Sequence, residues 1–109
     1  MLTISVVTAV LNGAATIGAC LDSVAAQRGS TEHIVVDGKS SDGTVEIVKA
    51  RGTAVARFVS ERDTGLYAAM NKGVAVANGE IVGTLNADDV YAGDSVLERV
   101  RKAFDDPNV

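Results

Sequence analysis

The chain has 109 residues, of which 47% are apolar and 22% charged, and this composition is typical of one soluble globular domain. A chain of this size buries enough surface for one hydrophobic core, which excludes a second domain. Ten basic and 14 acidic side chains leave a net charge of -4, so the sequence offers no cationic surface to bind nucleic acid as its main partner.

Cys20 is the only cysteine, which excludes an intrachain disulfide and a multi-cysteine metal site. A single cysteine also fits a reducing compartment. No apolar run approaches ~18 residues, and the first residues lack a basic segment, so the sequence predicts neither a membrane span nor a signal peptide. These features favour a cytoplasmic location.

Apolar periodicity predicts a strand over residues 4–10, followed by a helix whose apolar residues recur at i, i+3, i+4 and i+7. These residues are Ile17, Cys20, Leu21 and Val24. A second strand over 33–37 precedes a short helix over 44–51, for which Ser41 or Asp42 is the expected N-cap.

The same alternation continues to the end of the chain. A third strand is predicted over 55–60 and a helix over 66–78, which Asn78–Gly79 would end. A fourth strand covers 80–86, and the last helix begins near Ser95, where a glutamate three residues later gives the spacing of a capping box. The pattern predicts a Rossmann-like, doubly wound α/β fold with a mainly parallel four-stranded sheet and helices on both faces.

Polar residues follow the predicted strands at the carboxyl edge of the sheet, where open parallel sheets bind their ligands. The first strand runs into residues 8–12, the second ends at Asp37, the third runs into 61–63 and the fourth into 86–89. Three of the four strands therefore deliver carboxylates to one edge.

Asp88 and Asp89 form the strongest single element, because adjacent carboxylates repel each other unless a cation or hydrogen-bond donors share them. Mg²⁺ or Mn²⁺ would remove this repulsion, since both prefer oxygen ligands. Capping of a solvent-exposed turn explains the pair equally well when it is taken alone.

Asp37 ends an apolar strand and precedes a loop rich in glycine and serine, so its carboxylate is placed to accept a hydrogen bond from a nucleotide base or ribose. A turn capped by Ser41 or Asp42 explains the loop but not Asp37. His33 is expected to be an ordinary surface or boundary residue without a role.

Gly73 lies in the interior of the helix predicted over 66–78, where glycine weakens helix formation. Packing against the sheet and contact with a ligand are equally good explanations for it. Cys20 lies on the apolar side of its predicted helix and is expected to be a small hydrophobic residue rather than a nucleophile.

Four segments together resemble the family-2 inverting glycosyltransferases across essentially the whole chain. They are Ser5 to Asn12, Ile34 to Gly38 with Ser41 to Thr44, Asp63 to Gly73, and Leu85 to Asp89. The resemblance implies a GT-A fold whose first half binds a nucleotide sugar and whose second half binds the acceptor. Residues 1–109 would then be a single nucleotide-sugar-binding domain, a truncated GT-A fold without the acceptor half.

The resemblance also implies roles for residues of this chain. Thr8 and Asn12 would lie beside the nucleotide, and Asp37 would contact the base. Asp63 and the loop into Leu66 would flank the base.

In the same resemblance Asp88 holds the ribose, and Asp88 and Asp89 hold the Mg²⁺ or Mn²⁺ that bridges the diphosphate. Asn86 stands where many members have the first acid of an Asp-x-Asp motif, so the metal would depend on these two carboxylates alone. The donor would be a nucleotide-diphosphate sugar, and the acceptor an unknown saccharide or lipid-linked molecule.

The carboxylate that serves as general base in this family lies downstream of Val109, so no catalytic residue is assigned to this chain. The domain alone is therefore expected to have little transferase activity and to self-associate through the surface that truncation exposes. The alternative is a noncatalytic nucleotide-binding or protein-assembly module that retains the fold. A signalling receiver domain is a weaker third option, because the chain has no fifth strand.

Overall fold

The computed structural model describes residues 2–106, in which four parallel strands form one sheet with the order β3-β2-β1-β4. The strands are β1 (Ile4–Val10), β2 (Thr31–Asp37), β3 (Arg57–Ser60) and β4 (Ile81–Thr84). The helices are α1 (Ile17–Ala25), α2 (Thr44–Ala50), α3 (Leu66–Val76) and α4 (Val96–Asp105), with a short 3-10 helix at Gly52–Ala54.

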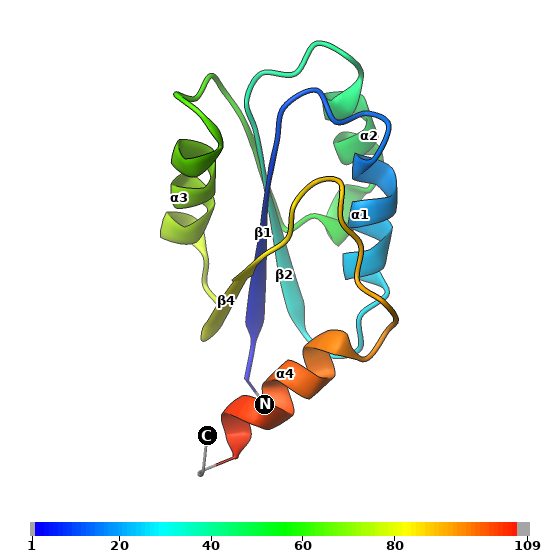
Figure 1. Cartoon of the computed structure of the whole chain (residues 1–109), viewed down its shortest axis with the longest axis vertical. Coiled ribbons are helices and arrows are strands. Elements are labelled where there is room, and N and C mark those ends of the chain that lie inside the picture. The colour runs from blue at the N-terminus through cyan, green and yellow to red at the C-terminus, as the bar shows by residue number, and fades with distance from the viewer. Residues whose placement is uncertain (1, 107–109) are drawn as a thin grey trace.

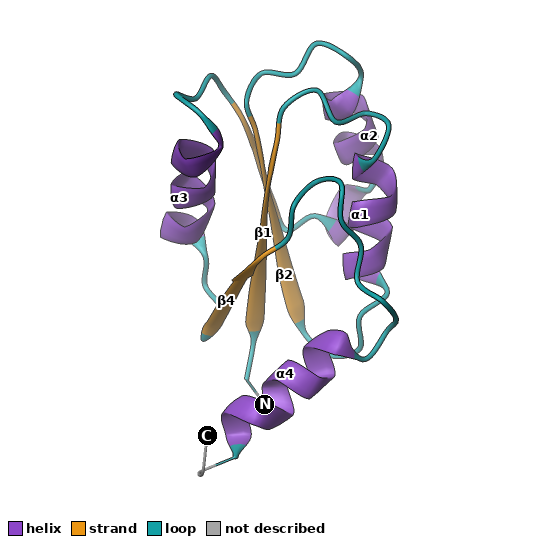
Figure 2. Cartoon of the chain, in the orientation of Figure 1, coloured by secondary structure: helices purple, strands orange, loops and turns teal. Residues whose placement is uncertain are grey.

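Helices cover both faces of this sheet (Figure 1). α1 and α2 lie on one face and α3 on the other, while α4 lies across the amino end of the strands (Figure 2). The predicted doubly wound, Rossmann-like α/β fold is therefore confirmed. The fourth helix is the exception to the expected pattern, because it closes one end of the sheet instead of covering a face.

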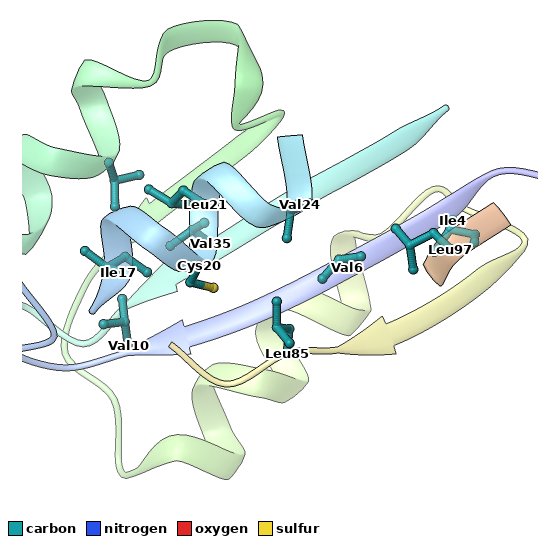
Figure 3. Packing of buried hydrophobic residues seen from close by; sticks show 11 residues of the cluster. Ile4, Val6, Val10, Ile17, Cys20, Leu21, Val24, Val35, Leu85 and Leu97 are labelled. Carbon is teal, nitrogen blue, oxygen red and sulfur yellow. The ribbon is translucent and has the colours of Figure 1, made fainter. Parts of the chain in front are cut away.

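Burial of both faces explains why β1 is apolar almost without interruption. Ile4, Val6 and Val10 pack towards α1, whereas Val7 packs towards α3. Figure 3 shows the first of these two groups, in which Leu97 of α4 belongs to the same cluster as Ile4 and closes its amino end. The core therefore has two parts, one on each side of the sheet.

The strands begin and end where their pairing begins and ends. β2 starts at Thr31, two residues before the predicted start, because Thr31 already pairs with Ile4. β3 starts at Arg57, two residues later than predicted, because its pairing with β2 begins there, opposite Ile34. β4 ends at Thr84, which pairs with Val7, and the chain then turns away from the sheet.

α3 ends at Val76, two residues before the predicted end. The backbone N–H of Asn78 donates to Oε1 of Glu32 at 2.9 Å, and that of Gly79 donates to Oγ of Ser5 at 2.8 Å. A Cβ on Gly79 would lie 2.6 Å from the backbone nitrogen of Ser5, so glycine lets the chain approach the sheet here. Contacts with the sheet therefore end the helix, not a C-terminal cap.

The predicted helix caps are corrected in detail. Gly43, with φ +100°, occupies the N-cap position of α2. Asp42 still fulfils part of the expected function, because its Oδ1 accepts the backbone N–H of Thr44 at 3.1 Å. Ser95 is the N-cap residue of α4, as expected, but its side chain makes no capping hydrogen bond, so the predicted capping box does not form.

His33 is buried, which corrects the expectation of a surface or boundary residue. Its side chain is 2% exposed, because β2 is an interior strand and His33 shares the α1 side with Val35. Its Nε2 lies 2.8 Å from Oγ1 of Thr8, which is fully buried as well. Burial lowers the pKa of His33 to about 4.

Cys20 is buried on α1, as predicted, and its Sγ lies 4.0 Å from Oγ1 of Thr8. Burial raises the pKa of this thiol, so the residue remains neutral near pH 7. The expectation of a small hydrophobic residue is confirmed.

The closest approach between α3 and β1 occurs at Gly73, where a Cβ would overlap Cγ1 of the buried Val7. We expect Gly73→Ala to lower the free energy of unfolding by about 1–3 kcal/mol, the usual cost of overpacking a core. Gly83→Ala is the matched control, because a Cβ at Gly83 meets no atom within 4 Å. Urea unfolding measures both variants, and equal midpoints for Gly73→Ala and the unaltered chain would contradict the packing role.

The outer edge of β4 pairs with no strand among residues 2–106. Self-association through this edge stays a prediction, which sedimentation velocity at high protein concentration checks. Within the same described range, no helix has the length and apolar character that a membrane span requires.

Candidate functional site

The carboxyl ends of β2, β1 and β4 lie side by side at one edge of the sheet. Asp37, the last residue of β2, pairs with Val10 at the end of β1. Residues 85–95, which we call the acidic loop, follow β4 and carry Asp88 and Asp89. The acidic residues predicted to form one site therefore emerge on the same edge, on either side of β1.

A pocket of about 740 Å³ opens at this edge between β1, α3 and the acidic loop. It is lined by residues 9–13 and Thr16 after β1, by Leu66, Tyr67 and Met70 of α3, and by Thr84 and residues 86–88 at the end of β4. Three of the predicted nucleotide-binding residues are among them, namely Asn12, Leu66 and Asp88. The volume is within the range of pockets that hold small-molecule ligands.

A smaller cavity of about 70 Å³ adjoins Leu11, Gly38, Asp63 and Leu66. The Asp63 side chain is 4% exposed, and its Oδ1 forms an ion pair with Lys72. Its Oδ2 is buried and has no hydrogen-bond partner among the described residues. Buried carboxylate oxygens normally accept a hydrogen bond, so this atom is available to a donor group on a ligand.

Lys72 joins two acidic side chains below this cavity. Its Nζ contacts Oδ1 of Asp63 and lies 2.7 Å from Oε1 of Glu61. Hydrogen bonds to Asp63 and then to Glu61 are the main causes that raise the pKa of Lys72. Lys72 is therefore cationic at neutral pH and forms ion pairs with both carboxylates.

Asp37 is fully buried and its carboxylate accepts four hydrogen bonds. Oδ2 accepts the backbone N–H groups of Lys39 at 3.1 Å and Ser40 at 3.0 Å and the hydroxyl of Ser60 at 2.8 Å, while Oδ1 accepts the hydroxyl of Ser40. Three of these bonds go to Oδ2 and one to Oδ1. In this geometry Asp37 holds the loop after β2, mainly through Oδ2, and its contact with a base stays a prediction.

Asn12 links the loops that follow β1 and β2. Its side-chain oxygen accepts the backbone N–H of Ser41 at 2.9 Å, and its own N–H donates to Oγ of Ser40 at 2.7 Å. Asn12 has φ +52° and Lys39 has φ +75°, a left-handed backbone region that non-glycine residues seldom adopt. Such strained residues concentrate at functional sites, which supports this edge as the site.

Thr8 precedes Ala9 in β1, where the pocket lining begins, and does not itself line the pocket. Its side chain is fully buried on the α1 side of the sheet and contacts His33, so it does not reach a ligand at the edge directly. The predicted place of Thr8 beside the nucleotide stays a prediction.

Asp88 and Asp89 are exposed at the start of the acidic loop. Neither carboxylate forms a hydrogen bond, to backbone or side chain, or an ion pair within residues 2–106, so the turn-capping alternative has no support. No group of three potential metal-ligating side chains occurs in this part of the chain. Two adjacent carboxylates nevertheless fit Mg²⁺ or Mn²⁺, because these ions take one or two protein carboxylates and complete their shell with phosphate oxygens and water.

Leu11 and Tyr67 are pocket residues that sequence reasoning missed. Leu11 lines both cavities and is 57% exposed, and Tyr67 is 89% exposed on the first turn of α3. Large apolar side chains that lie exposed around a pocket are typical of ligand-binding surfaces. The place of Leu11 in the sequence could have identified it, because it is an apolar residue that immediately follows a buried strand.

Fold and site together define a doubly wound α/β domain with its ligand pocket at the carboxyl edge of a parallel sheet. Residues 5–109 match the family model described as glycosyl transferase family 2, and the chain therefore belongs to this family.

Relatives and solved structures agree with this assignment. A PGL/p-HBAD biosynthesis glycosyltransferase of Mycobacterium bovis is 41% identical over 100 residues, covering 88% of this chain and 39% of that protein. The mannosyltransferase PcManGT from Pyrobaculum calidifontis, in complex with GDP-Man and Mn²⁺, has a TM-score of 0.86 at 30% identity, over 97% of this chain and 33% of that one.

S. aureus TarS 1-349 in complex with UDP-GlcNAc has a TM-score of 0.87 at 25% identity, over 94% of this chain and 31% of that one. These matches confirm the Rossmann-like half of a GT-A fold. The chain spans about 40% of the length of the curated relatives it matches.

Proposed function

We propose that this domain binds a nucleotide-diphosphate sugar across the carboxyl edge of its sheet, with Mg²⁺ or Mn²⁺ held by Asp88 and Asp89. It is the donor site of an inverting transferase that passes the sugar to a saccharide or lipid-linked acceptor. The observation that carries the proposal is the pocket of about 740 Å³ lined by Asp88, which with the adjacent Asp89 forms a pair of exposed carboxylates that have no protein partner within residues 2–106. The nucleotide-sugar complexes of PcManGT and TarS support it.

The residues of the smaller cavity suit a nucleobase. Leu11 and Leu66 offer apolar surface to the faces of a planar ring, and Oδ2 of Asp63 would accept an N–H from its edge. Asp37 and Asn12 would act by holding the loop over this cavity, as their hydrogen bonds to Ser40 and Ser41 indicate. The base would therefore lie between β1 and α3.

The diphosphate would lie against the acidic loop. Asp88 and Asp89 would each supply a carboxylate oxygen to the cation, and Asp88, which lines the pocket, would also reach the ribose. A cation held there would supply positive charge against the diphosphate, on which negative charge would develop as the sugar leaves.

The general base of an inverting reaction must face the acceptor on the side opposite the leaving group. Among the described residues, Asp88 supplies the carboxylate that lines the larger pocket, and the metal role already uses it. We infer that the base comes from outside the described residues and that this domain alone transfers sugar slowly.

Calorimetric titration with UDP and with GDP, each in the presence and absence of Mn²⁺, tests the proposal. At least one nucleotide should bind, with an affinity that rises when Mn²⁺ is present. Heats indistinguishable from dilution for both nucleotides in both conditions would refute the donor site and favour an assembly module.

A further inference from the structure

The acidic loop has no helix or strand of its own, yet it is anchored along its length to one face of α1. Cys20 donates from Sγ to the carbonyl oxygen of Asn86 at 3.7 Å. One turn further along, Oγ of Ser23 accepts the backbone N–H of Tyr91 at 3.2 Å. The anchor points therefore lie on both sides of Asp88 and Asp89 along the chain.

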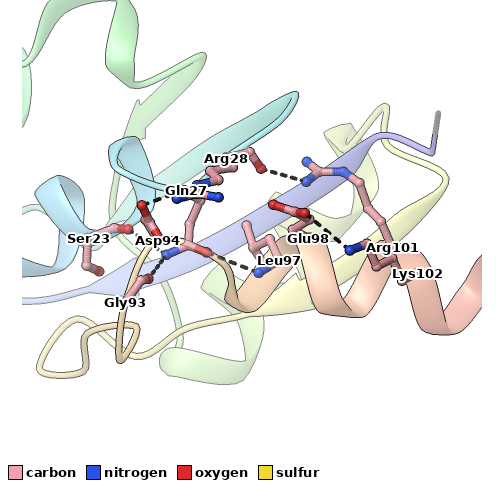
Figure 4. A network of polar contacts seen from close by, with 9 residues as sticks. All are labelled: Ser23, Gln27, Arg28, Gly93, Asp94, Leu97, Glu98, Arg101 and Lys102. Atoms are coloured by element: carbon pink, nitrogen blue, oxygen red, sulfur yellow. Dashed lines mark hydrogen bonds and ion pairs between the residues drawn. The ribbon is translucent and has the colours of Figure 1, made fainter.

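Gln27 provides the third anchor, one further turn along the same face and just beyond the last residue of α1 (Figure 4). Its Nε2 donates to the carbonyl oxygens of Gly93 and Ser23, and its Oε1 accepts the backbone N–H of Leu97 at 3.0 Å. The side chain is 7% exposed, and both donors and the acceptor of its amide are used.

The side-chain amide of Gln27 takes the place of the missing N-cap hydrogen bond of α4. The N–H of Leu97 belongs to the first turn of that helix, where Ser95 makes no side-chain bond. Because Gln27 forms hydrogen bonds with both Gly93 and Leu97, it fixes the end of the acidic loop to the start of α4. Arg28 reinforces the same point, with its backbone N–H donating to the carbonyl oxygen of Asp94 at 2.9 Å.

We propose that Gln27 and Ser23 are positioning residues that hold Asp88 and Asp89 ready for the divalent cation. The inference rests on the proposed function, since it concerns the same metal site. Two adjacent carboxylates repel each other before a cation is bound, and an unanchored loop would relax away from the binding geometry. Binding would then have to restore the order of the loop, which lowers affinity.

A purely structural role predicts a different result, and Arg101 supplies the control. Its buried guanidinium donates to the carbonyl oxygens of Leu2, at 2.9 Å, and of Arg28, at 2.8 Å, and so fixes α4 without touching the acidic loop. Arg101→Lys should therefore destabilise the domain while leaving the loop in place.

Amide hydrogen exchange of the metal-free chain measures loop order directly. The N–H of Asp89 donates to the carbonyl oxygen of Asn86 at 3.0 Å. In Gln27→Met this amide and that of Tyr91 should exchange about ten times faster than in Arg101→Lys, at a temperature where both variants are folded. Ser23→Ala should have the same effect on Tyr91, and it serves if Gln27→Met does not fold.

Titration of UDP or GDP with Mn²⁺ then measures the functional effect. Gln27→Met should lower the Mn²⁺-dependent affinity about tenfold, Ser23→Ala should lower it less, and Ser23→Thr, which retains the hydroxyl, should restore it. Affinity in Arg101→Lys should stay within twofold of the unaltered chain. Equal effects of Gln27→Met and Arg101→Lys, in exchange or in affinity, would overturn the positioning role.

The two proposals fail in distinguishable ways. Absence of nucleotide binding in the unaltered chain would refute the donor site, whereas unchanged exchange at Asp89 and Tyr91 would refute the anchoring by Gln27 and Ser23 whatever the ligand.

Discussion

Asp89→Asn is expected to abolish most of the Mn²⁺-dependent affinity of the domain for UDP or GDP, a loss of about 100-fold or more. Changes to groups that merely orient a metal ligand lower metal affinity 10- to 100-fold, so removal of a charged ligand should cost at least as much. Asp89 is exposed and has no ion pair within the described residues, so the fold itself should be unaffected.

Asp94→Asn is the matched control for this prediction. Asp94 belongs to the same acidic loop, but its carboxylate lies 3.3 Å from Nε of Arg28 and is therefore already paired. Calorimetry with and without Mn²⁺ should show near-normal affinity for Asp94→Asn and loss for Asp89→Asn. Equal affinities in Asp89→Asn and the unaltered chain would remove Asp89 from the metal site.

Acidification from pH 6.5 to about 4 is expected to lower the free energy of unfolding by about 3 kcal/mol through His33 alone. Burial lowers the pKa of His33 from 6.5 to about 4, so between these values the unfolded chain binds a proton that the folded chain does not. The free energy of unfolding therefore rises with pH between about 4 and 6.5, and His33 adds nothing further at higher pH. The partner of the ring, Thr8, carries no charge to offset the burial.

His33→Gln isolates this effect, because glutamine can still bond to Thr8 but does not titrate. Carboxylates with lowered pKa values, such as Glu32 and Asp42, contribute pH dependence in both proteins and cancel in the comparison. Urea unfolding at a series of pH values measures the free energy of unfolding as a function of pH. This free energy should rise less steeply with pH for His33→Gln than for the unaltered chain. Parallel curves from pH 7 to pH 4 would contradict the burial of a neutral His33.

The fold could be predicted because the apolar pattern that marks each strand or helix lies within the residues of that element. The strand predicted over residues 4–10 is β1 with the same bounds, since every side chain in it is buried and the apolar run starts and stops with the strand. The end of α3 was misplaced because it depends on Glu32 and Ser5, which are distant in sequence. Long-range hydrogen bonds leave no periodic pattern to detect.

The location of the candidate site was predicted correctly, but the hydrogen bonds of its residues were not. Strand ends placed Asp37 and the acidic loop on one edge, which the strand order confirms. The hydrogen bonds of these groups depend in part on distant partners, such as Ser60, which lies 23 residues from Asp37 in the sequence. The same limit hid the hydrogen bond between Thr8 and His33, although one threonine and one histidine within two apolar strands were a signal for such a contact.

The order of the strands has a consequence for synthesis. β1 is an interior strand, flanked by β2 and β4, so within this domain it acquires its second neighbour only after residues 81–84 have been synthesised. Until then a nascent chain exposes the unpaired edge of a predominantly apolar strand, the kind of surface that chaperones protect. Translation pauses before this point should therefore favour aggregation more than pauses after it.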